Sequence, residues 1–361
     1  MKKHNIVLVS GGTGGHVIPA VNFGNSIVEN GHNCYLLIDN RGKKYVSNFR
    51  GEIIVICSSH LNKNFFGKLK SLFFLLFGLL QAIFYLIKIR PTKCITFGSY
   101  ASFMPLIILS LLKFFGLTHL YLHEQNSVMG KVNIFFSPLA NRIFLNFKET
   151  KKLKKVYKKK SFFVGLPKSP IYNYRLRKIN VENNIIKRIF VFGGSQGAVS
   201  LNYKIKNLLL KINKECSTKI EISIQCPSSQ FNELTEIFKK AQVKYELKIY
   251  YDNILDKLYQ TDILIARAGA GTINDVIVTQ IPTIFIPLPN SSDNHQYENA
   301  KYLNDKKAAI LIEEKDLNQE STYFIFKELI ENFEKRLLLI KNLQSIKVLD
   351  ANKIMMKKIF E

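Results

Sequence analysis

The chain has 361 residues, 47% of them hydrophobic, which is enough for one large domain or, more naturally, for two domains that each bury a core. Lys and Arg outnumber Asp and Glu by 52 to 27, and the net charge of +25 favours polyanions (nucleic acid, anionic lipid head groups or phosphorylated small molecules), unless it only reflects a general enrichment in Lys, Asn, Ile and Phe. Five cysteines without a Cys-x-x-Cys pair argue against a disulfide framework and a zinc site, and they fit a reducing compartment.

The first predicted element is a buried strand close to the N-terminus. Only Ile6 to Val9 are apolar before the first glycine pair, which is too short for the apolar region of a signal peptide. Similar short apolar runs recur along the first half, and their continuous apolar character is typical of strands covered on both faces, as in a parallel sheet. The predicted strands of this half are Asn5–Ser10, Cys34–Ile38, Ile53–Cys57, Cys94–Phe97, Leu120–His123 and Arg142–Leu145.

A glycine-rich loop, GGTGGH at 11–16, joins the first strand to a predicted helix that Gly31 would end. Glycines at such a turn let backbone N–H groups approach phosphate oxygens, so we expect Thr13, Gly14 and Gly15 to bind a substrate phosphate. The loop matches neither the dinucleotide fingerprint nor a Walker loop. His16 lies at the helix start, where its near-neutral pKa makes it a candidate general base; a capping or solvated histidine is the alternative.

One segment of the first half is more apolar than a helix of a soluble α/β domain usually is. Residues 71–87 read SLFFLLFGLLQAIFYLI, without a charge, and Lys and Arg flank them on both sides. The run is at the lower limit of a bilayer span, which takes about 20 residues. A span would also place the glycine loop and the rest of the chain on opposite sides of the membrane. We therefore predict a helix in the membrane interface with its basic ends on anionic head groups, and keep a core helix as the alternative.

A polar cluster, HEQN at 123–126, follows the predicted strand at 120–123. Its side chains would emerge at the carboxyl edge of the sheet, where ligands bind in α/β proteins. Glu124 is a second candidate base, in place of His16. The alternative is a helix cap or an ordinary loop.

The second half repeats the strand, glycine turn and helix of the first. The segment between the halves, 151–184, is rich in Lys, Asn and Tyr, and we place the domain boundary there. Two doubly wound α/β domains that face each other across a cleft are the predicted architecture. The predicted strands of the second half are Ile189–Phe192, Ile220–Cys226, Leu247–Tyr251, Ile263–Ala266, Thr283–Ile286 and Ala308–Ile312.

Two more glycine loops follow strands of the second half, GGSQG at 193–197 and RAGAGT at 267–272. Ser195 adds a hydroxyl to the backbone donors of the first loop. Asp275 lies one turn into the helix after the second loop, where its carboxylate would accept hydrogen bonds from ribose hydroxyls. Two helix N-termini at one sheet edge indicate a nucleotide diphosphate. A further polar cluster at 293–300 is either part of this site or the polar start of a helix.

These clusters, in this order, resemble the motifs of the MurG family of glycosyltransferases. The resemblance rests on GGTGGH at 11–16, HEQN at 123–126, GGSQGA at 193–198, RAGAGT at 267–272 and HQYENA at 295–300, and it covers nearly the whole chain.

The resemblance implies an α/β fold of the GT-B type, with two Rossmann-like domains and a C-terminal helix that returns to the first. Residues 1–163 and 347–361 would form the acceptor- and membrane-binding domain, and residues 164–346 the UDP-sugar-binding domain. The implied activity is an inverting transfer of N-acetylglucosamine from UDP-N-acetylglucosamine to undecaprenyl-diphosphate-MurNAc-pentapeptide, a step of peptidoglycan synthesis at the cytoplasmic face of the inner membrane. No metal, cofactor or nucleic acid is implied.

The same resemblance implies roles for individual residues. His16 would be the base, with Glu124 as the substitute, and the loop at 11–16 would face the acceptor diphosphate. The implied donor-side residues are Ser195, Ala270, Gly271, Thr272 and Asp275 for the diphosphate and ribose, Lys168 for the diphosphate, Tyr251 for the uracil, and Gln296 and Asn126 for the sugar.

Two of the implied donor-side residues differ from the family pattern. Asp275 stands where the family usually has Glu, which keeps the carboxylate on a shorter side chain. Lys168 stands where the family has Arg; it keeps the charge but loses the bidentate geometry.

Three other functions remain open on the sequence alone. A GT-B glycosyltransferase with another lipid acceptor would share every motif. A UDP-N-acetylglucosamine epimerase would bind the same donor but would need no apolar membrane segment. A non-enzymatic RNA-binding protein would explain the net charge, but the chain has no RNA-binding motif and the glycine loops would then have no role.

Overall fold

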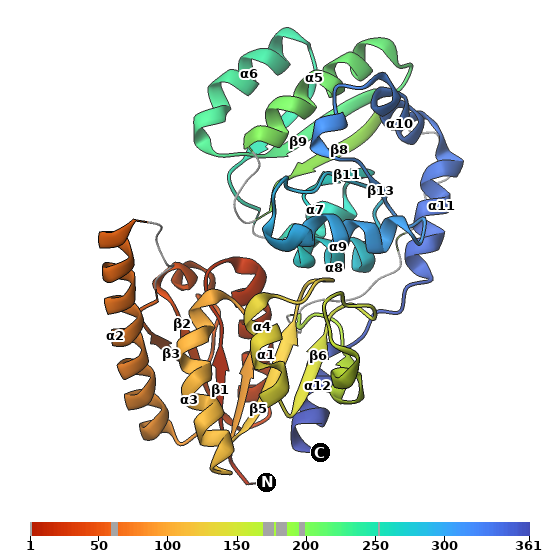
Figure 1. Ribbon diagram of the computed structural model, residues 1–361. Coiled ribbons are helices and arrows are strands. Elements are labelled where there is room, and N and C mark those ends of the chain that lie inside the picture. The colour runs from red at the N-terminus through yellow and green to blue at the C-terminus, as the bar shows by residue number, and fades with distance from the viewer. Residues whose placement is uncertain (1, 59–63, 169–176, 178–185, 195–198, 252) are drawn as a thin grey trace. The chain divides into compact units, whose positions relative to one another are not determined.

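The computed structural model describes residues 2–58, 64–168, 177, 186–194, 199–251 and 253–361. The chain folds into two compact units, Met1–Asn173 together with Leu349–Glu361, and Tyr174–Val348 (Figure 1). Residues 164–168, which we expected in the second domain, belong to the first unit. Val164 belongs to the buried core of the first unit, so the segment after its last strand packs with that unit.

The first unit is built on a seven-stranded sheet with the order β3-β2-β1-β4-β5-β6-β7, in which every neighbouring pair is parallel. The chain starts in the middle of the sheet, at β1, and the strand order reverses between β1 and β4. This is the Rossmann order, and the reversal is the place where α/β proteins bind ligands. The strands are β1 (Asn5–Val9), β2 (Asn33–Ile38), β3 (Glu52–Val55), β4 (Lys93–Thr96), β5 (His119–Glu124), β6 (Arg142–Leu145) and β7 (Ser161–Phe163).

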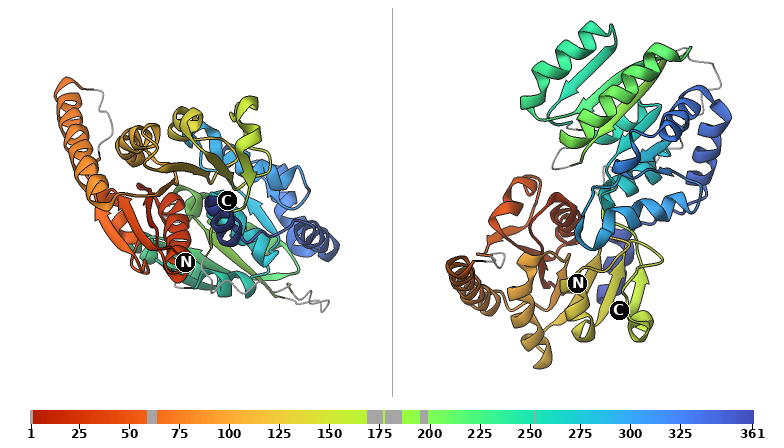
Figure 2. Two further views of the ribbon diagram at one scale, coloured as in Figure 1. Left: turned by 90° about the horizontal axis from the view of Figure 1, so that it is seen from below. Right: turned by 45° about the horizontal axis from the view of Figure 1, so that its top comes forward.

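Helices cover both faces of this sheet, which explains the continuous apolar runs of its strands. In β1, Ile6 and Leu8 join a core beneath α1 and α12, whereas Val7 and Val9 join a second core beneath α2, α3 and α4. The C-terminal helix α12 returns to the first unit and packs beside α1 (Figure 2). The helices are α1 (Gly14–Glu29), α2 (Phe65–Ile89), α3 (Phe103–Phe114), α4 (Lys131–Phe136) and α12 (Ala351–Phe360).

Helix α1 ends where the sequence predicts it to end. Gly31 has a φ of 82°, a conformation that costs glycine little, and its N–H donates to the carbonyl of Val28 at 2.9 Å. The N–H of His32 reaches back to the carbonyl of Ile27 at 3.2 Å. This pair of bonds is a Schellman motif, which satisfies the last carbonyls of the helix.

Helix α2 is docked on the sheet along one side only. A Cβ at Gly78 would lie 2.0 Å from the carbonyl oxygen of Cys57, so the glycine allows the helix to approach the end of β3. The next turn fixes the same contact, because Gln81 Oε1 accepts the N–H of Cys57 at 2.8 Å. Ala82 and Leu86 on this side are buried in the core. The segment Lys70–Ile89 is long and apolar enough to cross a membrane by length and composition.

The second unit repeats the Rossmann order in a six-stranded parallel sheet, β10-β9-β8-β11-β12-β13. Its reversal point lies between β8 and β11. The strands are β8 (Ile186–Phe192), β9 (Lys219–Gln225), β10 (Lys244–Lys248), β11 (Ile263–Ala266), β12 (Thr283–Phe285) and β13 (Ile310–Leu311). The helices are α5 (Val199–Glu215), α6 (Phe231–Lys240), α7 (Ile254–Tyr259), α8 (Ala270–Thr279), α9 (His295–Asn304), α10 (Glu320–Glu331) and α11 (Phe333–Gln344).

Two strands at sheet edges differ from the sequence-based prediction, one because it is absent from it and the other because its bounds differ. β7 was not predicted, since it has only three residues. β10 covers Lys244–Lys248 instead of 247–251. Its alternation of charged and apolar residues suits an edge strand, whereas Ile249 and Tyr250, which continue the apolar run, are exposed in the following loop.

Candidate active site

Three loops of the first unit meet at one edge of its sheet, because parallel strands all end at the same edge. The loop after β1 carries the glycines, Gly98 follows β4, and Gln125 follows β5. β1 and β4 are neighbours, but the chain continues from them to opposite sides of the sheet. The predicted base and the polar cluster at 123–126 therefore lie at the reversal point of the first unit.

The shape of the first glycine loop depends on Asp39, a residue that the sequence analysis missed. Gly12 has a φ of 77°, and its N–H donates to Asp39 Oδ1 at 2.8 Å. The same carboxylate accepts the N–H of Gly42 at 3.2 Å and binds Arg41 Nε at 2.6 Å. A Cβ at Gly11 would lie 2.6 Å from the Cβ of Ala101, so this position also requires glycine. The N–H of Gly12 is thus used within the protein and is not offered to a phosphate.

The start of α1 is the part of the loop that could bind an anion. Thr13 is the N-cap, and its carbonyl accepts the N–H groups of His16 and Val17 at 3.1 and 3.2 Å. Gly14 and Gly15 are the first two residues of the helix, where backbone N–H groups have no acceptor within the helix. Gly15 is exposed. A phosphate at this position would also gain from the positive end of the helix dipole.

The ring of His16 is held by two acceptors. Its Nδ1 lies 2.8 Å from the carbonyl oxygen of Phe97 and 3.1 Å from Gln125 Oε1. A carbonyl oxygen can only accept, so Nδ1 carries the proton and donates it. The neutral ring then has its lone pair on Nε2. His16 is half-buried, and its free nitrogen has the protonation state that a general base needs.

Glu124, the other candidate base, is tied into its own loop. The side chain is 2% exposed, and Oε1 accepts the N–H of Asn126 at 3.0 Å. Oε2 accepts the N–H of Gly130 at 2.9 Å and the amide of Asn133 at 2.8 Å. The side-chain amide of Asn126 also reaches Oε1 at 3.5 Å, so both carboxylate oxygens are engaged by residues 126–133. This geometry favours His16 over Glu124 as the base and gives Glu124 the role of shaping the loop that carries Asn126.

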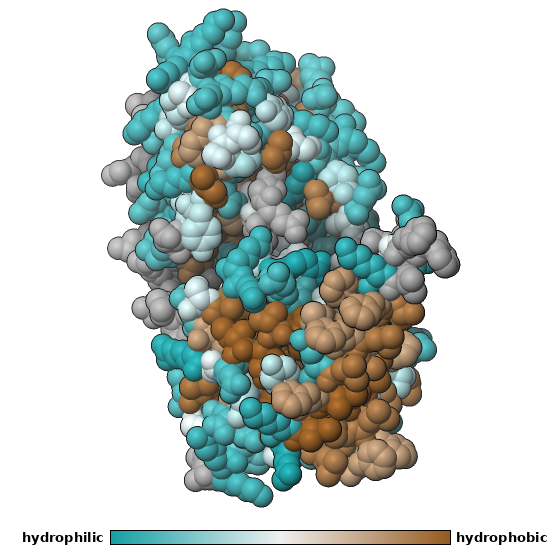
Figure 3. All heavy atoms as spheres, turned by 90° about the vertical axis from the view of Figure 1, so that its left-hand side faces the viewer, coloured by the Kyte–Doolittle hydropathy of each residue, from teal (hydrophilic) through white to brown (hydrophobic). Residues whose placement is uncertain are grey.

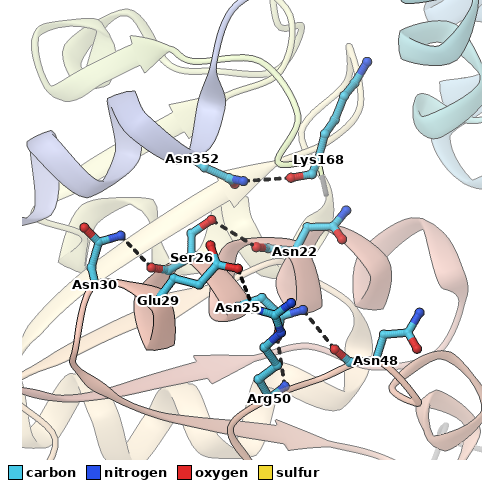
Figure 4. Close-up of polar contacts among 9 residues, drawn as sticks. All are labelled: Asn22, Asn25, Ser26, Glu29, Asn30, Asn48, Arg50, Lys168 and Asn352. Atoms are coloured by element: carbon cyan, nitrogen blue, oxygen red, sulfur yellow. Dashed lines mark hydrogen bonds and ion pairs between the residues drawn. The ribbon is translucent and has the colours of Figure 1, made fainter. Parts of the chain in front are cut away.

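Lys168 belongs to the first unit, although we expected it in the second domain. Its backbone carbonyl accepts the side-chain amide of Asn352 at 2.7 Å, and the preceding carbonyl, of Pro167, accepts the amide of Asn22 at 3.2 Å. Figure 4 shows that the Lys168 ammonium extends away from this contact. Figure 4 also shows contacts that tie α1 to the loop before β3, through the Arg50–Glu29 ion pair at 2.7 Å and Asn25.

The second unit gathers the other predicted residues at the carboxyl edge of its own sheet. Gly193 and Gly194 follow β8, and the loop 267–269 follows its neighbour β11. Gly269 is the N-cap of α8, whose first three residues are the predicted Ala270, Gly271 and Thr272. Ser195 lies outside the described residues. The positive N-terminus of α8 therefore lies at the reversal point of this sheet, as an anion site in this fold requires.

A buried ion pair, which was not predicted from the sequence, fixes the loop before α8. Arg267 binds Glu314 Oε2 at 2.6 Å and donates to the carbonyls of Ile286 and Pro287 at 3.2 and 3.0 Å. The other oxygen of Glu314 accepts a hydrogen bond from Ser200, in the first turn of α5. Glu314 thus links the beginning of α5 to the loop that leads into α8. Only the Arg of the glycine motif gave a sequence signal for this pair.

Tyr251, the predicted uracil contact, lies after β10, beside an aromatic ring and charged side chains. Its ring packs edge-on against Phe190 at 5.0 Å, and its hydroxyl donates to Glu246 Oε2 at 3.3 Å. Lys257 binds the same oxygen at 2.5 Å. Burial alone would raise the pKa of Glu246, but hydrogen bonds from Lys257 and Lys248 lower it to about 2, so the carboxylate is charged and fixes Tyr251.

The remaining donor-side residues lie on α8 and α9. Asp275 is partly exposed in α8. Gln296 lies at the start of α9, and its Oε1 accepts the N–H of Leu288 at 3.0 Å, so it closes the loop that follows β12. Asn299, on the same helix, donates to the carbonyl of Ala268 at 3.1 Å. Hydrogen bonds from α9 thus reach both the loop after β12 and the loop before α8.

Comparison with protein families identifies both units. Residues 6–145 match the glycosyltransferase family 28 N-terminal domain, and residues 188–347 match the glycosyltransferase family 28 C-terminal domain. A relative from Rickettsia canadensis is 36% identical over 323 residues, which are 88% of each chain. Another from Wolbachia pipientis is 31% identical over 330 residues, 91% of each chain. Both carry the name UDP-N-acetylglucosamine–N-acetylmuramyl-(pentapeptide) pyrophosphoryl-undecaprenol N-acetylglucosamine transferase.

Comparison with solved structures confirms the GT-B fold. The structure of Acinetobacter baumannii MurG aligns with a TM-score of 0.77 at 21% identity and covers 99% of both chains. A glycotransferase of kitacinnamycin aligns with a TM-score of 0.69 at 14% identity and covers 99% of this chain. The predicted pair of Rossmann-like units is thus confirmed as a known architecture of sugar-transferring enzymes.

Proposed function

Since the chain belongs to glycosyltransferase family 28 and, within it, to the UDP-N-acetylglucosamine–N-acetylmuramyl-(pentapeptide) pyrophosphoryl-undecaprenol N-acetylglucosamine transferases, we propose that its two sheet edges hold the two substrates of that reaction. The enzyme moves N-acetylglucosamine from UDP-N-acetylglucosamine to undecaprenyl-diphosphate-MurNAc-pentapeptide, converting lipid I to lipid II in peptidoglycan synthesis. The observation that carries the assignment of sites is the position of every described motif at the carboxyl edge of a Rossmann-ordered sheet.

His16 is the proposed base. Its Nε2 takes the proton of the acceptor hydroxyl while the hydroxyl oxygen forms a bond to the anomeric carbon of the donor. The bond from that carbon to the diphosphate oxygen breaks, and UDP leaves with the electron pair. Attack opposite to the leaving group inverts the anomeric centre. The protonated Nδ1 of His16, bound to the Phe97 carbonyl, supports this role because it leaves Nε2 free to accept.

The second unit is the proposed donor site. The leaving UDP gains negative charge, and the N-terminus of α8 offers fixed N–H donors at the reversal point. Tyr251 is the proposed contact of the uracil and Asp275 that of the ribose. The other proposed contacts are Ser195, Ala270, Gly271, Thr272 and Lys168 for the diphosphate, Gln296 and Asn126 for the sugar, and Thr13, Gly14 and Gly15 for the phosphates of the acceptor.

Transfer of radiolabelled N-acetylglucosamine to purified lipid I tests the proposed reaction directly. We expect the label in the lipid fraction and one UDP released for each sugar transferred. Two matched assays separate the alternatives: diacylglycerol as the acceptor, and UDP-N-acetylglucosamine alone followed by analysis for an epimerised sugar. Label in diacylglycerol or an epimerised product, with none in lipid I, would contradict the proposal.

The outer face of α2 supports a membrane-surface location. We define this face as Leu72, Phe73, Leu76, Phe77, Leu80, Phe84 and Ile87, all of which are exposed. Figure 3 shows the apolar surface of this side of the molecule. Exposed apolar side chains continue it at the end of α3 (Phe114, Phe115 and Leu117) and on α4 (Phe135). An apolar surface of this extent is typical of a contact with lipid or with another protein.

The topology argues for an interfacial position and against a bilayer span. α2 connects β3 to β4, and both strands belong to the same sheet. A helix through the bilayer would separate them. The inner side of α2 is also committed to the core through Ala82 and Leu86. We propose that the outer face enters the acyl region of the cytoplasmic leaflet and that Lys68, Lys70, Lys88 and Arg90 at the helix ends contact anionic head groups.

Replacement of Phe73 and Phe84 by serine tests this surface. Removing two exposed phenylalanines (67% and 62% exposed) from the contact lowers the binding to vesicles of phosphatidylglycerol and phosphatidylethanolamine at least about tenfold, since a buried phenylalanine contributes about 2 kcal/mol. Co-sedimentation with vesicles measures the effect. Phe324→Ser, an exposed phenylalanine of the second unit, is the matched control. Unchanged sedimentation of the double variant would contradict the proposed location.

A further inference from the structure

Two buried side chains stand behind His16 and have no role in the substrate contacts proposed above. Gln125 Oε1 faces His16 Nδ1 at 3.1 Å, and Gln125 Nε2 lies 3.2 Å from His123 Nδ1. His123 Nε2, in turn, lies 3.0 Å from the carbonyl oxygen of Gly165. Gln125 is 1% exposed and His123 is fully buried. The contacts form a continuous chain from His16 through Gln125 and His123 to the backbone after β7.

The direction of every hydrogen bond in this chain follows from its two ends. The Gly165 carbonyl can only accept, so His123 donates from Nε2, and its neutral ring accepts at Nδ1. The Phe97 carbonyl can only accept, so His16 donates from Nδ1. Gln125 must then donate its amide to His123 and accept from His16, which is the orientation the structure has. The opposite tautomer of either histidine would break the chain.

We propose that Gln125 and His123 are positioning residues. They hold His16 with its proton on Nδ1 and, through the bond from Nδ1 to Gln125, stabilise the positive charge that forms on His16 when Nε2 takes the acceptor proton. This inference rests on the proposed role of His16. An imidazolium donates more strongly than a neutral imidazole, so the Gln125 and Phe97 oxygens bind His16 more tightly once it is charged. The bond to Gln125 thus gains strength during proton transfer, whereas a bond that only serves packing would not change.

His123 is suited to this task because it stays neutral. Burial lowers the pKa of His123 to about 4, so its Nδ1 remains an acceptor for Gln125 at neutral pH. Its ring stacks on Phe97 with centroids 5.1 Å apart, and the carbonyl of the same residue binds His16. Gly165 completes the arrangement with a φ of 84°. Backbone and ring contacts therefore fix both histidines from opposite ends of Gln125.

The other titratable groups near His16 lie on three elements. His123 and Glu124 lie on β5, and Glu124 is held by the amide of Asn133, which lies beside Gly98. Asp39, paired with Arg41, lies at the glycine loop. Tyr45 packs against Gly14. Among the described residues Gln125 bonds to His123, which burial keeps neutral, and to none of Glu124, Asp39 and Tyr45, so a change in the pH profile reports on the contact between Gln125 and His16.

Two substitutions of Gln125 are expected to shift the pH dependence of kcat in opposite directions. Gln125→Leu removes the acceptor, so we expect kcat to fall about 10-fold to 100-fold, the usual effect of losing a hydrogen bond to a charged group, and the acidic limb to move to lower pH. Gln125→Glu places a carboxylate against Nδ1, which stabilises the imidazolium and moves the acidic limb to higher pH. The KM for UDP-N-acetylglucosamine should stay within about twofold in both variants, because neither Gln125 nor His16 is among the proposed contacts of the donor.

The controls separate this inference from a structural role and from the proposed function. Gln230→Leu, at a buried glutamine of the second unit, should leave the acidic limb in place. In a His16→Ala background, Gln125→Leu should cause no further loss. Nitrogen-15 NMR of the labelled wild-type protein should show His16 protonated at Nδ1. Unmoved limbs in both Gln125 variants would overturn the inference while leaving His16 as the base. The opposite tautomer would contradict both the inference and the base, because Nε2 could then not accept a proton, and full turnover of His16→Ala would overturn the base alone.

Discussion

Replacement of His16 by alanine is expected to lower kcat about 1,000-fold, which is within the range for loss of a general base. The affinity for UDP-N-acetylglucosamine should not change, because the donor contacts that we propose lie mainly on the second unit. The reason for the large effect is geometric. Nε2 is the unprotonated nitrogen of a ring that is fixed by Phe97 and Gln125, and alanine removes this nitrogen.

Measurement of this effect requires two separate assays. Transfer of labelled sugar to lipid I gives kcat, and isothermal titration with UDP-N-acetylglucosamine gives the donor affinity. His119→Ala is the matched control, since His119 is an exposed histidine on β5, a strand that also contributes to this site. A drop in donor affinity equal to the drop in turnover would point to a disturbed fold, and an undiminished kcat would show that His16 is not the base.

The sequence predicts the architecture well because most strands of both sheets are covered on both faces. The strands at the sheet centres, such as β1 and β11, are apolar runs followed within three residues by a glycine, so their type and their ends can be predicted together. The edge strands β7 and β10 have no such signal. One is too short, and the other has a charged face that makes it look like part of a loop. Prediction fails at these two edge strands, whereas the edge strands β3 and β13 overlap predicted apolar runs.

The site could be predicted in its glycines but not in the groups that support them. Asp39 lies far from the glycine loop in sequence and binds Gly12 only because β2 is the neighbour of β1. Glu314 lies after β13, far from Arg267 in the sequence, and the two side chains come together only when the sheet is folded. Neither residue is part of a local motif. Glu124, in contrast, is in a motif, but its hydrogen bonds to Asn126, Gly130 and Asn133 of α4 could not be foreseen from its position in the sequence.

Helix α2 shows a further limit of prediction from composition. Its residues are apolar nearly all round, so hydropathy alone does not distinguish the docked side from the outer face. The two residues that do so are Gly78 and Gln81, a small and a polar side chain within an apolar run, and both contact Cys57. In this helix the interruptions of the apolar pattern mark the inner side.

Replacement of Glu314 by glutamine is expected to destabilise the second unit by about 3 kcal/mol. The variant leaves the Arg267 guanidinium buried without its counter-charge, and breaking a buried ion pair in this way costs about 3–5 kcal/mol. The bonds of Arg267 to the Ile286 and Pro287 carbonyls remain and reduce the loss. The matched double variant, Arg267→Met with Glu314→Leu, removes both charges and should lose less stability than Glu314→Gln alone.

The pH dependence of this loss has a definite sign. Burial alone would raise the pKa of Glu314, but hydrogen bonds from Ser200 and Arg267 hold it below its ordinary value of 4.5. The unfolded chain therefore binds the proton more readily than the folded one, so the contribution of Glu314 is complete above that value and disappears as the pH falls through the lower folded pKa. The stability difference between wild type and Glu314→Gln should shrink on acidification over the same range.

Hydrogen exchange of backbone amides shows which of the two units is destabilised by Glu314→Gln. In Glu314→Gln, the amides of α5, α8 and β11 should exchange faster, because Glu314 links the first turn of α5 to the loop before α8. Amides of β1 and β4, in the first unit, serve as the internal control. Equal acceleration in both units would indicate global unfolding, and no acceleration in α5 and α8 would contradict the role of this ion pair. Because the donor diphosphate is proposed to bind at these two helix starts, a confirmed loosening should also weaken UDP-N-acetylglucosamine binding.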